Sequence, residues 1–353
     1  MNERGVTQLF SDSAERMRSK VVGIYAFLIA ANIGAWAWAL IVFRDRPVLL
    51  GLAFLAYSFG LRHAFDADHI AAIDNVTRKL MQEGKRPVTV GFFFSLGHST
   101  IVVALAVAIA LTTVTLQGHF EALKDIGGVI GTSVSALFLF AIAAANILVL
   151  KEVYQAFKRA KSGEYFDEAD INDILSKRGL LGRLMYPAFT LIERSWHMYP
   201  LGILFGLGFD TATEVGLLGI SATQAAQSMS IWSILVFPAL FTAGMSLMDT
   251  TDSMIMVGAY GWAFVKPIRK LYYNMTVTFV SVVAAVVVGG IEALGLIGDK
   301  LGLQGPLWQT IATLNDNFGL VGYWIVAFFV ASWLVSYAVY RIKNYDHVES
   351  AAP

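Results

Sequence analysis

The sequence predicts an all-α polytopic membrane protein with eight transmembrane helices, and three observations support this fold class. Of its 353 residues, 56% are hydrophobic and only 15% are charged, a composition too apolar for an ordinary soluble domain. Apolar stretches near 20 residues, each long enough to cross about 30 Å of hydrocarbon, recur along the chain. The basic residues gather beside alternate stretches, as expected for the cytoplasmic face of a membrane.

The apolar stretches define the expected spans. They cover residues 21–43, 48–70, 88–114, 127–150, 200–222, 231–260, 272–298 and 320–340. The first follows a charged segment and lacks a small-residue cleavage site, so we interpret it as a retained span and not a signal peptide. The third and sixth are long enough to tilt or break.

The basic residues orient these spans. Most of the 26 Lys and Arg fall in the amino-terminal segment, the second, fourth and sixth loops, and the tail. The second loop contributes Arg78, Lys79, Lys85 and Arg86. We therefore expect both termini in the cytoplasm, with the chain in the cytoplasmic (inner) membrane of a prokaryote.

The organisation expected is two membrane halves joined by a charged loop. Residues 1–150 hold spans one to four, and residues 200–353 hold spans five to eight and a short tail. Residues 151–199 form the cytoplasmic loop, with a short amphipathic helix expected near 167–178. The basic residues are dispersed at membrane borders, so the expected partner is lipid and not nucleic acid. Eight spans can enclose a complete pathway, so a functional monomer is expected.

The second span ends in a cluster of ionisable groups within residues 62–70. Such groups are costly in a bilayer unless paired or hydrated, so they indicate a functional site. On an ideal helix His63, Asp66 and His69 form one oblique stripe, while Asp68 lies off it. The two histidines would be about 9 Å apart along the axis. Either the helix is distorted here, or other spans complete an ion's coordination sphere.

A purely structural alternative is that Arg62 and Asp66 form an i,i+4 ion pair while the histidines bond to neighbouring helices. Two histidines and two aspartates within seven residues favour ion handling instead. Three later spans also carry ligand-type side chains. These are His98 in the third span, Asp210, Thr211 and Glu214 in the fifth, and Asp249 and Asp252 in the sixth.

The side chains available as ligands restrict which metal ions the site can bind. The chain has no cysteine, which excludes thiolate ligands and disulfides. Calcium and magnesium prefer oxygen alone, whereas mixed imidazole and carboxylate ligands suit later first-row dications. Nickel, cobalt, zinc, ferrous iron and manganese remain open at this point.

Four motifs resemble those of the nickel/cobalt transporter family. They are residues 62–70 (RHAFDADHI), 94–99 (FSLGHS), 207–214 (LGFDTATE) and 241–252 (FTAGMSLMDTTD). The resemblance implies eight spans with cytoplasmic termini and uptake of Ni²⁺ or Co²⁺ as substrate, with no resident cofactor and no enzymatic activity. It also implies that the first motif carries metal recognition and that the others line the path.

From the resemblance and the ligand chemistry together, we expect His63, Asp68, His69 and His98 to bind the metal. The expected pathway residues are Arg62, Asp66, Asp210, Thr211, Glu214, Asp249 and Asp252. No P-loop motif occurs, so we expect a secondary permease driven by the membrane potential.

Short similar segments in different spans suggest an internal repeat. Residues 59–61 (FGL) recur as 205–207, and residues 94–99 (FSLGHS) resemble 241–246 (FTAGMS). These similarities pair spans two and three with spans five and six. Because an offset of three spans reverses the direction of the chain through the membrane, such a repeat would be inverted, as in many secondary transporters.

Two functions other than uptake would leave different marks in the sequence. Metal efflux would be suggested by a histidine-rich cytosolic loop, but residues 151–199 contain only His197. A membrane-embedded metalloenzyme would need a His-Glu-x-x-His motif or several histidine boxes, and the chain has 6 histidines and no such motif.

Overall fold

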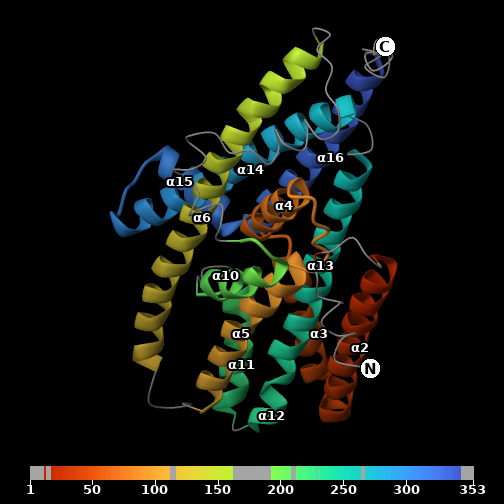
Figure 1. Ribbon diagram of the computed structural model, residues 1–353. Coiled ribbons are helices and arrows are strands. Elements are labelled where there is room, and N and C mark those ends of the chain that lie inside the picture. The colour runs from red at the N-terminus through yellow and green to blue at the C-terminus, as the bar shows by residue number, and fades with distance from the viewer. Residues whose placement is uncertain are drawn as a thin grey trace.

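The computed structural model describes residues 12, 17–111, 117–161, 192–207, 212–227, 229–263 and 267–342, and over these ranges the regular structure is helical (Figure 1). The loop helix expected near 167–178 lies outside the described residues, as do Asp210 and Thr211. The long helices are α2 (Met17–Phe43), α3 (Pro47–His63), α4 (Ala67–Gln82), α5 (Val90–Leu111), α6 (Gln117–Lys161), α13 (Val236–Ala263), α14 (Pro267–Lys300) and α16 (Phe318–Ile342). The shorter ones are η1 (Ser195–His197), α10 (Met198–Phe205), α11 (Ala212–Ala226), α12 (Ile231–Ile234) and α15 (Pro306–Asp316).

The helical membrane architecture is confirmed. Among the described residues, 6 helices are long and apolar enough to cross a membrane, or up to 7 if α3 and α4 form one broken span. The predicted span 200–222 coincides instead with α10, of 8 residues, and α11, of 15 residues. Each is shorter than the roughly 20 residues that a crossing needs.

The second predicted span is not one straight helix. α3 ends at His63, α4 begins at Ala67, and their axes are bent by 49°. A turn joins them, in which the carbonyls of Arg62 and His63 accept the backbone N–H groups of Phe65 and Asp66. Figure 1 shows α4 turned away from the line of α3. The predicted span 48–70 is therefore two helices, which is one of the two possibilities raised by the wide spacing of His63 and His69.

Helix α4 is polar and yet buried, which corrects the placement of Arg78 and Lys79 in the second loop. These side chains are only 1% and 6% exposed. Arg78 donates to Ser281 and Thr278 on α14, and Lys79 donates to the carbonyl of Ile192. Because the protein interior satisfies both charges, hydropathy alone cannot recognise this segment as buried.

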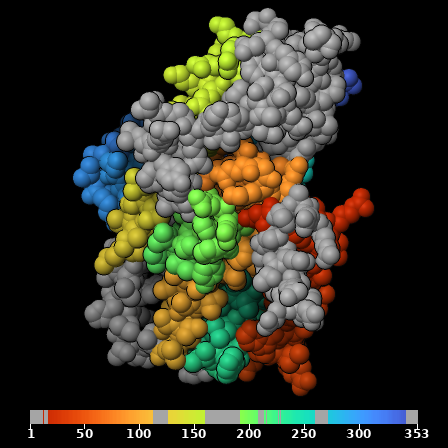
Figure 2. Space-filling model, in the orientation of Figure 1, coloured from red at the N-terminus to blue at the C-terminus, as the bar shows by residue number. Residues whose placement is uncertain are grey.

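Glycines allow the helices that carry the polar motifs to pack closely. A Cβ at Gly60 of α3 would overlap the Phe241 carbonyl of α13, and one at Gly91 of α5 would overlap the Asp249 carbonyl. A Cβ at Gly97 would likewise overlap the backbone of α10. Small residues of this kind let backbones approach in membrane proteins. Figure 2 shows the atoms of α10 and α5 adjoining on one face of the molecule, consistent with their packing.

Candidate metal centre

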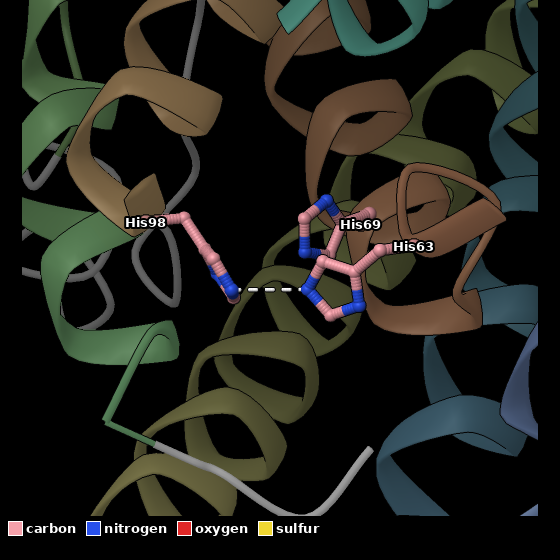
Figure 3. A group of neighbouring side chains, drawn as sticks. All are labelled: His63, His69 and His98. Carbon is pink, nitrogen blue, oxygen red and sulfur yellow. Dashed lines mark hydrogen bonds between the residues drawn. The ribbon is translucent and has the colours of Figure 1, made fainter. Parts of the chain in front are cut away.

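Three buried histidines converge at the junction of three helices. His63 is the last residue of α3, His69 lies in the first turn of α4, and His98 lies in α5. One ligand atom from each lies within 4.8 Å of the others, and all three side chains are buried. The ring centroids are 4.6 to 4.9 Å apart, and Figure 3 shows His98 facing the other two rings.

The break between α3 and α4 explains how His63 and His69 meet. On a straight helix they would be about 9 Å apart along the axis. Because the chain turns over Ala64–Asp66 and restarts in a new direction, their ring centroids are 4.6 Å apart. The helix is thus distorted, as one of the two possibilities required, and α5 places a third imidazole beside the pair.

Glu214 is the carboxylate that joins this group of histidines. It lies in the first turn of α11 and is fully buried. Its Oε1 is 2.8 Å from Nε2 of His98 and 3.9 Å from Nε2 of His63. The sequence placed Glu214 on the pathway, and the structure places it directly beside two of the imidazoles.

The spacing of the nitrogens is suitable for shared ligation. Nε2 of His63 and Nε2 of His98 are 2.9 Å apart, the contact drawn in Figure 3. Two donors that each lie about 2.05 Å from one ion, at a right angle to each other, are separated by about 2.9 Å. Right-angle donor pairs occur in octahedral and square-planar coordination, which later first-row dications adopt.

Two further carboxylates contact the opposite nitrogens of the rings. Asp66 Oδ2 lies 2.7 Å from His63 Nδ1, which is also 3.2 Å from the Thr213 hydroxyl. Both carboxylate oxygens of Asp249 lie 3.3 Å from His69 Nδ1. Asp66, Asp249 and Thr213 are all buried. The centre is thus surrounded by acceptors on both sides of the imidazoles.

The other predicted residues lie outside the three-histidine group. Asp68 is half-buried in the first turn of α4, and Asp252 lies three residues beyond Asp249 on α13. Arg62 is exposed near the end of α3. The carboxylate of Asp66, which the ion-pair alternative assigned to Arg62, is directed at His63.

Sequence reasoning missed two other buried carboxylates. Asp74 on α4 accepts a hydrogen bond of 2.6 Å from Ser281, and Glu292 on α14 accepts hydrogen bonds of 2.8 Å at both oxygens from Ser135. Glu292 could have been noticed, since it is an acidic residue within an apolar stretch. Asp74 could not, because hydropathy assigned its segment to a loop.

Comparison with known proteins identifies close relatives along almost the whole chain. The family described as "High-affinity nickel-transport protein" matches residues 49–339. A "High-affinity nickel transport protein" of Cupriavidus necator is 58% identical over 341 residues, 97% of each chain. "Hydrogenase nickel incorporation protein HupN" of Bradyrhizobium diazoefficiens is 51% identical, covering 96% of this chain and 90% of its own.

A relative with a different named metal is also similar. "Cobalt transport protein NhlF" of Rhodococcus rhodochrous is 41% identical over 291 residues, 81% of each chain. No solved structure matches the chain. From the match over residues 49–339 and the full-length relatives, the chain belongs to the high-affinity nickel-transport protein family.

Proposed function

We propose that this protein carries divalent nickel, cobalt or both into the cell, through an intramembrane site formed by His63, His69, His98 and Glu214. The observation that carries the proposal is the convergence of three buried imidazoles whose ligand atoms lie within 4.8 Å of one another. Buried ionisable groups in a membrane protein commonly mark the path of an ion. The metal is the substrate in this proposal, and no resident cofactor is needed.

The ligand chemistry supports the choice of metal. Three imidazoles and one carboxylate suit later first-row dications, whereas magnesium and calcium would want oxygen ligands. Relatives along the chain are named for nickel and, in one case, for cobalt. A transport role is supported by the same names, and a metalloenzyme has no support from them. Asp68, Asp252, Arg62, Asp210 and Thr211 are proposed to line the path to and from the site.

The energy source we propose is the membrane potential. The sequence has no P-loop, so the chain has no recognisable means of hydrolysing ATP. An inward-negative potential supplies about 2.3 kcal/mol per charge per 100 mV, hence about 4.6 kcal/mol for a dication. This is enough to favour inward movement of the metal without a further coupled reaction.

We further propose eight crossings, with both termini in the cytoplasm of a prokaryote and α10 and α11 as the two halves of the fifth. The breaks in the second and fifth spans support an inverted repeat. The FGL sequence at 59–61 ends three residues before the turn that begins at Ala64, and the FGL at 205–207 begins at the last residue of α10. Broken helices at corresponding positions are typical of binding sites in repeat-built transporters.

The cysteine-free chain permits a direct test of the crossing number. Between Arg46 and Asp299 the proposal places six crossings, so Arg46→Cys and Asp299→Cys should both react with an impermeant maleimide from outside the cell. Glu83→Cys, between α4 and α5, should react only after the membrane is opened. If α10 and α11 do not cross, the number is odd, and only one of the first two positions will be labelled in intact cells.

Uptake itself is tested with radiolabelled nickel and cobalt in cells that lack their own high-affinity transporter. Expression of the chain should raise accumulation of at least one metal, and Glu214→Gln should abolish the increase at equal membrane abundance. Faster loss of metal from preloaded cells would indicate efflux and overturn the proposed direction. Unchanged accumulation of both metals would overturn the proposal that nickel or cobalt is the substrate.

A further inference from the structure

We infer that Asp66 and Asp249 are positioning residues, each holding a carboxylate against Nδ1 of one histidine so that the opposite nitrogen, Nε2, faces the metal. The inference rests on the proposed function and deepens it. It assigns the three carboxylates that contact the histidines two separate roles, with Glu214 beside the ion and the two aspartates behind the imidazoles.

The position of Asp66 supports this assignment. It is the residue before α4 and has the extended backbone of an N-cap, with φ −65° and ψ 144°, but its side chain makes no capping hydrogen bond. An aspartate cap typically contributes about 1 kcal/mol to helix stability. Instead, Oδ2 lies 2.7 Å from His63 Nδ1. The carboxylate is therefore directed at the imidazole and not at the open end of its own helix.

Asp249 makes the corresponding contact from a distant part of the chain. It lies on α13, and both of its oxygens are 3.3 Å from Nδ1 of His69 on α4. The close approach of α5 to α13 at Gly91, where a Cβ would overlap the Asp249 carbonyl, fixes this part of α13 against the site. The carboxylate is thus held by the packing of the helices.

The Nε2 nitrogens of His63 and His69, which do not face these aspartates, are the ones available to a metal at the centre of the three histidines. With its Nδ1 beside Asp66, His63 presents Nε2 to His98 and to Glu214, at 2.9 and 3.9 Å. Nε2 of His69 is buried and has no hydrogen-bond partner among the described residues. A buried polar atom without a partner is costly and calls for a ligand. A metal ion that contacts this nitrogen would remove the cost.

General metal chemistry explains why such an arrangement is useful. A neutral imidazole that donates Nδ1–H keeps its free lone pair on Nε2. A carboxylate that accepts this N–H fixes the tautomer, orients the ring and raises its basicity as a ligand. Glu214 differs because it approaches the Nε2 side of His98 and His63, where the ion would lie.

The two roles predict different responses to the same conservative substitution. An asparagine in place of Asp249 keeps an oxygen that can accept Nδ1–H, but an amide is a poor substitute for a carboxylate that ligates a metal. We expect Asp249→Asn and Asp66→Asn to bind nickel within about threefold of wild type. We expect Asp249→Ala to lose about 10- to 100-fold in affinity, the usual effect of removing such a partner. Glu214→Gln should lose at least as much as Asp249→Ala.

The experiment measures nickel binding by the purified full-length protein in detergent, using titration calorimetry, with monodispersity checked by gel filtration. As a second readout, the cobalt-loaded protein is studied by proton NMR for paramagnetically shifted, solvent-exchangeable N–H signals. Wild type should show signals from Nδ1–H groups of Nε2-bound histidines. Asp249→Ala should weaken one of them by faster exchange, while Asp249→Asn should retain it.

Different results of this experiment would refute the proposed function and the inference about the aspartates. If wild type binds neither nickel nor cobalt, the proposed function fails. If wild type binds metal but monodisperse Asp249→Asn and Asp66→Asn lose as much affinity as Asp249→Ala, the aspartates act as ligands and the inference is overturned. The inference is also overturned if Glu214→Gln binds as tightly as wild type while the asparagine variants do not.

Discussion

Gly206→Ala tests whether the exact placement of His98 determines metal affinity. Gly206 follows α10 and packs on the backbone of α5 at His98. An added Cβ would lie 2.9 Å from the His98 carbonyl oxygen and 3.2 Å from its Cα, whereas ordinary contact begins at 3.4 Å. The shortfall of 0.5 Å must be relieved by separating the two segments.

The displacement is large compared with the tolerance of a metal site. His98 Nε2 lies 2.9 Å from His63 Nε2 and 2.8 Å from Glu214. Ligand distances are usually held to within about 0.2 Å, so a shift near 0.5 Å removes His98 from good coordination geometry. We expect about a tenfold loss of nickel affinity, or about 1.4 kcal/mol. The overpacking itself should cost about 1–3 kcal/mol of stability.

The assay is nickel titration of the purified variant, combined with radiolabelled uptake at equal membrane abundance. The matched control is Gly258→Ala on α13, because a Cβ there meets no atom within 4 Å. Wild-type affinity in a monodisperse Gly206→Ala protein would refute the reasoning. So would an equal loss of affinity in Gly258→Ala.

Three further predictions follow from the same site and its surroundings. His63→Ala or His69→Ala should abolish metal accumulation while membrane abundance is retained, and near-normal accumulation in both variants would move the site elsewhere. Because protons and the metal compete for the same imidazole nitrogens, uptake should weaken as external pH falls, and flat uptake between about pH 5 and 7.5 would contradict histidine ligation. Ser281→Ala removes the donor to Asp74 and should lower the free energy of unfolding by about 1–3 kcal/mol, seen as a reduced melting temperature in detergent. An unchanged melting temperature would contradict a stabilising role for that hydrogen bond.

Much of the helical architecture could be predicted from hydropathy, because an apolar stretch near 20 residues has few alternatives to a membrane helix. The predicted spans 21–43 and 320–340, for example, correspond to α2 (Met17–Phe43) and α16 (Phe318–Ile342). The same reasoning could not locate the break in the second span or the helix that follows it. There the chain breaks after His63 and continues as the polar helix α4, whose Arg78 is satisfied by hydrogen bonds that only the folded structure reveals.

The composition of the candidate site was predictable, but its geometry was not. Histidines and carboxylates within apolar stretches are visible in the sequence, and the structure brings His63, His69 and His98 together. Which nitrogen faces which carboxylate depends on the 49° bend between α3 and α4 and on the close packing of α13 against α5. An ideal-helix projection contains neither feature, so it placed Asp66 on the same stripe as the histidines and could not place it behind His63.

The most direct test of the account is an experimental structure of the nickel-loaded protein, with the ion located by anomalous scattering. We expect one ion about 2.1 Å from imidazole nitrogens of His63, His69 and His98, with Glu214 alongside and the two aspartates behind their rings. A nickel-soaked structure in which these imidazoles point apart, each bonded to other protein groups and with no ion near them, would contradict the account.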